Sequence, residues 1–222
     1  MPVAIRSFPR AFARLALAFA AALALAPIAS AQPAEGREYV RLKSPVPVET
    51  GKKIEVIEFF SYGCPHCADL EPHLQAWLKR LPADVQLRRV PVAFQPSWEN
   101  LAKVYYTLEL MGEDVKLTPD VFAAIHGGNR TNLANDTRFF EWAASKGLDR
   151  KKVEELFTSF AIVGRVNRAK QMAQAYNIQS VPTIIVDGKF TTGPERLQGA
   201  HAAIPVAIDG LIVKARAERP KG

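Results

Sequence analysis

An apolar segment that leads directly into a closely spaced pair of cysteines restricts this chain to few architectures. Residues 54–60 read IEVIEFF, a β-branched and aromatic run that predicts a strand buried on both faces. Cys64-Pro65-His66-Cys67 follows after a three-residue turn, and large apolar residues then recur at helical spacing to residue 81. A buried strand, a C-x-x-C segment and a helix in this order predict an α/β fold with the cysteines at a helix start.

The remaining elements extend this pattern. Helical spacing runs through residues 98–164 and again through 165–176, and Asp187-Gly188 is a hairpin signal. Short strands are expected at 39–42, 85–94, 183–186 and 190–192, and a last helix at 195–217. The natural packing for this order is a mixed central sheet with helices on both faces.

The first 31 residues have the pattern of a secretory signal peptide. Arg6, Arg10 and Arg14 precede an apolar run over 15–26, and Ala29-Ser30-Ala31 provides the small residues of a cleavage site. The apolar run is shorter than the ~20 residues of a spanning helix. We therefore expect cleavage after Ala31 and export to an oxidising compartment, where a lone cysteine pair is oxidised or redox-active.

The positive charge sits mainly at the two ends of the chain. Of the 29 basic residues, three lie in the first 31 positions and four in the last ten, against a total of 22 acidic residues. Nucleic-acid binding needs basic residues clustered on a folded face, so the sequence predicts no nucleic-acid partner. Two cysteines also exclude a scaffold of several disulfides.

The chemistry of the chain is concentrated in residues 64–67. Pro65 suits the first position of a helix, which places Cys64 where the helix dipole and unpaired N–H groups favour a thiolate. A protonated His66 adds positive charge, so Cys64 is the predicted attacking sulfur and Cys67 the resolving thiol. Stabilising the thiolate stabilises the reduced pair and makes the disulfide an oxidant.

Two other interpretations of the cysteine pair are weaker. A metal site would need further ligands, but there is no second cysteine pair, and His73, His126 and His201 lack ligand spacing relative to Cys64 and Cys67. A structural disulfide closing so short a loop would constrain little of the unfolded chain. The sequence therefore predicts no metal site and no cofactor beyond the Cys64–Cys67 disulfide.

The CPHC segment after residues 57–61 (IEFFS) resembles the DsbA family of periplasmic thiol–disulfide oxidoreductases. The resemblance covers nearly all of the chain after residue 31. It implies a thioredoxin fold formed by residues 32–97 and 165–222, with residues 98–164 as an inserted all-helical subdomain. It implies a disulfide donor to exported, unfolded proteins with free thiols, reoxidised by a DsbB-like, quinone-linked membrane oxidase. We also expect a monomer.

The same resemblance assigns three further site residues. Val181-Pro182 stands before the predicted strand 183–186, where the superfamily keeps a cis-proline facing the cysteines, and Val181 would offer backbone groups to a bound client strand. Glu58 matches an acid that would exchange a proton with Cys67; the alternative is a strand-end side chain that reaches water. Arg89 could pair with Glu58, although the family often has lysine there.

Several questions stay open from the sequence. An exported reductase or isomerase of the same fold would carry the same motifs, although only about 20 residues (32–52) lie between the expected cleavage site and the motif strand, too few for a dimerisation domain. A binding module with structural cysteines is a third reading. Tyr62, Gly63, Phe94 and Trp98 belong either to the core and turn or to an apolar peptide surface.

Overall fold

The structure is a computed structural model that describes residues 32–219. Its centre is a five-stranded mixed sheet with the strand order β1-β5-β4-β2-β3. The interior strand β2 pairs in parallel with β3 and antiparallel with β4, while β5 joins β4 to β1 through antiparallel pairing. The strands are β1 Val40–Arg41, β2 Ile54–Phe60, β3 Val85–Pro91, β4 Thr183–Val186 and β5 Phe190–Thr192.

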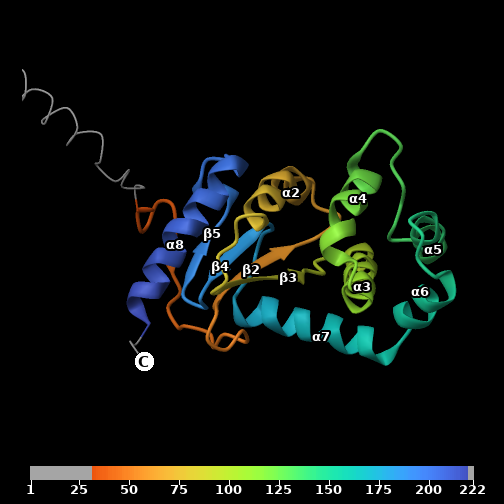
Figure 1. The fold of residues 1–222 in the computed structure, drawn as a ribbon, viewed down its shortest axis with the longest axis horizontal. Helices are drawn as coiled ribbons and strands as arrows, with labels where there is room; N and C mark the ends of the chain where they lie inside the picture. Colours follow the sequence, from red (N-terminus) through yellow and green to blue (C-terminus); the bar gives the residue numbers. More distant parts are fainter. Residues whose placement is uncertain (1–31, 220–222) are drawn as a thin grey trace, which may run out of the picture. The chain divides into compact units, whose positions relative to one another are not determined.

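Helices cover both faces of this sheet, as Figure 1 shows. One face packs against α2 (Pro65–Leu78) and α8 (Ile204–Glu218) through a core that includes Leu70, Trp77 and Ile208. The other face packs against α7 (Phe160–Ala175) and the helices that precede it. Every residue of β2 is buried, as its apolar sequence predicts for a strand covered on both faces.

Four helices lie together to one side of the sheet and carry much of the larger core (Figure 1). They are α3 Pro96–Met111, α4 Asp114–His126, α5 Asp136–Ser145 and α6 Arg150–Phe157. The predicted limits of the helical insertion, 98 and 164, do not coincide with helix ends. Helix α3 already begins at Pro96, because proline is well tolerated in a first turn, and Gly164 lies inside α7.

The C-terminal part contains one clear correction. The helix expected over 195–217 is interrupted: Pro194–Arg196 and His201–Ala203 form short 3-10 turns, η1 and η2, and α8 begins only at Ile204. Gln198 and Gly199 have φ values of 53° and 79°, which no right-handed helix accommodates. The hairpin prediction is confirmed, with Asp187 and Gly188 both at positive φ between β4 and β5.

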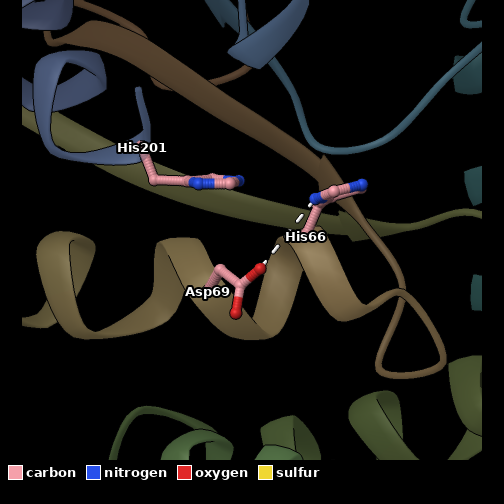
Figure 2. A group of neighbouring side chains, drawn as sticks. All are labelled: His66, Asp69 and His201. Atoms are coloured by element: carbon pink, nitrogen blue, oxygen red, sulfur yellow. Dashed lines mark ion pairs between the residues drawn. The ribbon is translucent and has the colours of Figure 1, made fainter. Parts of the chain in front are cut away.

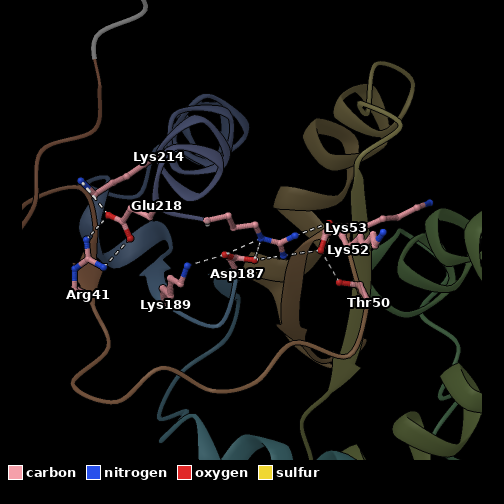
Figure 3. A network of polar contacts seen from close by, with 9 residues as sticks. Arg41, Thr50, Lys52, Lys53, Asp187, Lys189, Lys214 and Glu218 are labelled. Carbon is pink, nitrogen blue, oxygen red and sulfur yellow. Dashed lines mark hydrogen bonds and ion pairs between the residues drawn. The ribbon is translucent and has the colours of Figure 1, made fainter. Parts of the chain in front are cut away.

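Charged contacts fix the end of α8 against the sheet, as Figure 3 shows around Asp187. Glu218 accepts two hydrogen bonds from Arg41 on β1, at 2.7 and 3.0 Å. Arg219 binds the Asp187 carboxylate in the β4–β5 turn and donates to the carbonyls of Lys52 and Lys53. These contacts hold the last turn of α8 beside the turn that precedes β2.

The architecture confirms the predicted thioredoxin-type α/β fold, a mixed sheet flanked by helices with the cysteine pair between β2 and α2. The signal peptide predicted for residues 1–31 lies outside the described residues. Within residues 32–219, none of the helices has the length and apolar character needed to cross a membrane.

Candidate active site

The two cysteines lie at the start of α2, after the short turn that follows β2. Cys64 is the N-cap residue with extended backbone angles, and Pro65 occupies the first turn, as predicted. Cys64 is 5% exposed and Cys67 is fully buried, and both are present as free thiols. Only the first thiol of the pair therefore faces a partner molecule.

Hydrogen bonds and charge around Cys64 favour its thiolate. The thiol of Cys67 contributes most, followed by the backbone N–H groups of Cys67 and His66 and the positive charge of the His66 side chain. Together they outweigh the opposing effect of burial and lower the pKa of Cys64 from its ordinary 9.0 to about 6. The helix start and His66 were predicted from the sequence to lower the pKa of Cys64, but the larger effect of the Cys67 thiol was not.

Cys67 has the opposite electrostatic environment. Burial, its hydrogen bond to Cys64, and the negative charges of Cys64 and Glu58 raise the pKa of Cys67 well above 9.0. The pair therefore consists of one thiol that ionises easily and one that keeps its proton. This asymmetry assigns Cys64 as the sulfur that exchanges with other molecules.

A titration of the reduced protein checks this asymmetry. We expect thiolate absorbance near 240 nm to rise in one step centred at about pH 6, from Cys64 alone. Because Cys64 in the unfolded chain keeps its proton to about pH 9, the reduced protein should become more stable as the pH rises from 6 to 9. A single step near pH 9 would contradict the assignment, and the oxidised protein, which has no thiol to titrate, is the control.

The loop before β4 closes over the cysteine pair. The Val181–Pro182 peptide bond is cis, as the resemblance implies. The thiol of Cys64 donates a hydrogen bond to the carbonyl oxygen of Val181 at 3.4 Å, although the two residues are far apart in the sequence. The backbone of Val181 therefore lies where a client chain bound through Cys64 would meet it.

Beneath the active-site helix, one buried arginine holds two buried carboxylates. Glu58 on β2 lies opposite Arg89 on β3, and the Arg89 Nε atom donates to Glu58 Oε2 at 2.8 Å. Arg89 Nη2 also donates to Glu71 of α2 at 2.6 Å. Glu58 is 0% exposed, so the alternative of a side chain that reaches water is wrong. The guanidinium of Arg89 can pair with both carboxylates at once because it carries several N–H donors.

The protonation of this cluster is set by its burial. Burial, together with the neighbouring Glu58 charge and against the attraction of Arg89, raises the pKa of Glu71 to about 7. The Oε1 atom of Glu58 makes no hydrogen bond within the described part of the chain. Two carboxyl groups thus share one guanidinium below Cys67.

Thr118 and His126 of α4 contact Tyr62 in the turn before the cysteines, and the sequence indicated neither contact. Tyr62, considered for a peptide surface, is buried and its hydroxyl contacts Thr118 Oγ1 of α4 at 2.8 Å. His126 Nε2 contacts the Tyr62 carbonyl oxygen at 2.7 Å, so α4 fixes the turn before the cysteines. Phe94 is 49% exposed, and its ring lies 5.9 Å from that of Trp98. No local pattern marks Thr118 or His126, because their partners are distant in the sequence.

His66 and Pro65 are exposed on the outer side of the site. The His66 side chain is 68% exposed, and its Nδ1 atom lies 3.9 Å from Asp69 Oδ2. Its ring also stacks on that of His201, with 5.7 Å between centroids, a neighbour that the sequence did not indicate. His66 is thus accessible from solvent while it contributes positive charge to Cys64.

Comparisons with known proteins agree with this geometry. A family model described as Thioredoxin matches residues 50–205. The thiol:disulfide interchange protein DsbA of Bordetella parapertussis is 42% identical over 207 residues, which cover 92% of this chain and 97% of that protein. The DsbA of Pseudomonas aeruginosa is 41% identical over 186 residues, covering 84% of this chain and 87% of the relative.

Solved structures show the same relationship. The crystal structure of Pseudomonas aeruginosa DsbA superposes with a TM-score of 0.77 at 40% identity, covering 83% of this chain and 95% of that one. Reduced DsbA1 from Neisseria meningitidis superposes with a TM-score of 0.75 at 29% identity, covering 85% of this chain and 97% of that one. With the cysteine pair and the cis-proline loop in place, this chain belongs to the DsbA family of thiol:disulfide interchange proteins, within the thioredoxin superfamily.

Proposed function

We propose that this thiol:disulfide oxidoreductase works as a disulfide donor, giving its Cys64–Cys67 disulfide to newly exported proteins. The observation that carries the proposal is the split between the two thiols, with the pKa of Cys64 lowered to about 6 and that of Cys67 raised. A dithiol with one stable thiolate is favoured over its disulfide, which makes the disulfide easy to reduce. The pair itself carries the two electrons, with no further cofactor.

The reaction proceeds through two exchanges. A client thiolate attacks the Cys64 sulfur of the disulfide, a client–Cys64 bond forms, and the Cys64–Cys67 bond breaks with Cys67 leaving as a thiolate. A second client thiolate then attacks the client sulfur of this mixed disulfide and releases Cys64. The client loses two electrons and gains a disulfide, while the enzyme gains two electrons. Cys64 leaves readily because its thiolate is stable.

Residues around the pair assist each exchange. Cys67 leaves into a buried environment that disfavours its thiolate, so it must take up a proton. Glu58 is the proposed partner in this proton exchange, because its charge acts on Cys67 and its Oε1 atom has no partner within the described residues. The backbone of Val181, beside cis-Pro182, binds the client strand. His66 supplies positive charge that favours the Cys64 thiolate over the mixed disulfide.

The proposed setting is the periplasm. The basic, apolar and small-residue segments of residues 1–31 support export with cleavage after Ala31, so N-terminal sequencing of the exported protein should begin at Gln32. A sequence that begins at Met1 would contradict cleavage.

The protein acts as a monomer, and a DsbB-like, quinone-linked membrane oxidase reoxidises the pair after each cycle.

Oxidation of a reduced peptide with two cysteines tests the proposed activity. The oxidised protein should convert one equivalent of peptide dithiol to disulfide, while its own pair becomes reduced. The rate should exceed that of glutathione disulfide at the same concentration. Protein that has been reduced and alkylated serves as the control. A rate no higher than with glutathione disulfide would refute the proposal.

A further inference from the structure

Three side chains with metal-binding groups meet beside the first turn of α2. His66 and Asp69 lie one turn apart on α2, and His201 comes from η2, a separate segment near the C-terminus (Figure 2). Each residue offers one ligand atom, and these atoms all lie within 4.8 Å of one another. This is a cluster formed by the fold, because no sequence spacing links His201 to the other two.

The state of His201 points to a missing partner. Its Nε2 atom is buried but makes no hydrogen bond in residues 32–219. Nε2 lies at the outer end of the imidazole, and Figure 2 shows this ring extending toward His66 with Asp69 on the helix nearby. The rings of His66 and His201 are nearly parallel, at 19°. A buried ring nitrogen without a partner is unfavourable unless another group satisfies it.

We propose that His66, Asp69 and His201 form a binding site for a divalent transition-metal ion of the zinc and copper type. Two imidazoles and one carboxylate are the ligand types that such ions prefer, with metal–ligand distances of about 2.0–2.2 Å. The ligand atoms, which lie within 4.8 Å of one another, need to approach by at most about 1.4 Å for tetrahedral binding. The side chains of His66 and Asp69 are 68% and 63% exposed, so both can turn toward the ion, and water completes the coordination.

The proposed site uses neither thiol, so it can be tested independently of the disulfide-donor function. It joins the start of α2 to η2, two segments that already pack against each other and whose histidine rings are stacked. A bound ion also adds positive charge beside the residue that already contributes positive charge to Cys64. The site therefore offers a way for metal ions to act on the active-site helix from outside.

Zinc titration of the oxidised protein tests this site, because the closed disulfide removes the cysteines as ligands. The protein should carry residues 32–222 and no polyhistidine tag, and calorimetry should show one Zn²⁺ per chain. We expect His201→Ala and Asp69→Asn each to weaken zinc binding by about tenfold or more. His73→Ala, which removes a histidine of the same helix outside the cluster, should bind zinc like the unsubstituted protein.

Nuclear magnetic resonance of the unsubstituted protein gives a second test that needs no variant. Zinc should shift the ring-proton signals of His66 and His201 and leave those of His73 unchanged. Absence of saturable binding, or equal zinc affinity in the His201→Ala protein, would overturn the proposal. Zinc-induced shifts confined to His73 or His126 would also overturn it.

Discussion

Cys67→Ser protein isolated from cells is expected to carry client proteins covalently attached through Cys64. The substitution keeps the easily ionised sulfur of Cys64, which is 5% exposed, but removes the fully buried thiol that would release the client from the enzyme side. The Cys64 thiolate attacks a client disulfide, forms a mixed disulfide and releases one client thiolate, so mixed disulfides should accumulate and run as high-mass bands on non-reducing gels. Cys64→Ser should abolish peptide oxidation, because the one remaining cysteine, Cys67, is fully buried and cannot form the disulfide that accepts the electrons of the peptide.

The matched control for this capture is the double variant Cys64→Ser/Cys67→Ser, which should hold no client. Reductant should release the bands from the Cys67→Ser protein. An absence of mixed disulfides in Cys67→Ser cells would count against exchange through Cys64. Retention of full function by the double variant would favour a binding module with structural cysteines over an oxidoreductase.

Arg89→Met is expected to cause the largest loss of stability among single substitutions of charged residues in the site. Removing Arg89 leaves Glu58 and Glu71 buried without their cation, since Arg89 donates to both carboxylates. Breaking a buried ion pair in this way costs about 3–5 kcal/mol. Urea unfolding of the oxidised protein at pH 7 measures it. Arg216→Met removes the exposed pair with Asp84 and should cost at most about 1 kcal/mol.

The loss from Arg89→Met should also depend on pH. The pKa of Glu71 in the folded protein is about 7, above its ordinary 4.5, so the folded state binds more protons than the unfolded state between these values. The stability that this carboxyl contributes is complete below about pH 4.5 and falls as the pH rises toward 7. Without Arg89 this fall should steepen, so the loss should be smaller at pH 5 than at pH 7. Equal losses at both values, or a loss no larger than in Arg216→Met, would contradict the cluster's role.

Local sequence patterns were sufficient for the elements that set the fold. The unbroken apolar run of β2 predicts a strand covered on both faces, and Asp187-Gly188 predicts the hairpin, because each signal lies within a few residues. The prediction of one continuous C-terminal helix was wrong for a local reason that the apolar spacing does not reveal. Apolar spacing continues through 195–217, but the left-handed conformation at Gln198 and Gly199 breaks it.

Site residues that belong to short family motifs could be predicted from the sequence. Those that only the fold brings together could not. Cys64, Cys67 and the cis bond at Val181–Pro182 follow from short motifs. The second carboxylate of the buried cluster, Glu71, did not, because its pairing depends on α2 lying across β2 and β3. His201 is the extreme case, since it meets His66 only through the packing of η2 beside α2.

The redox potential of the Cys64–Cys67 pair tests the central claim most directly. Equilibration of the protein with glutathione buffers, followed by quantification of reduced and oxidised forms, gives the value. A disulfide donor whose Cys64 pKa is about 6 should have a potential near the oxidising end, on the order of −120 mV. A value near roughly −270 mV, typical of thioredoxin, would make the chain a reductant and contradict the proposed direction of electron flow.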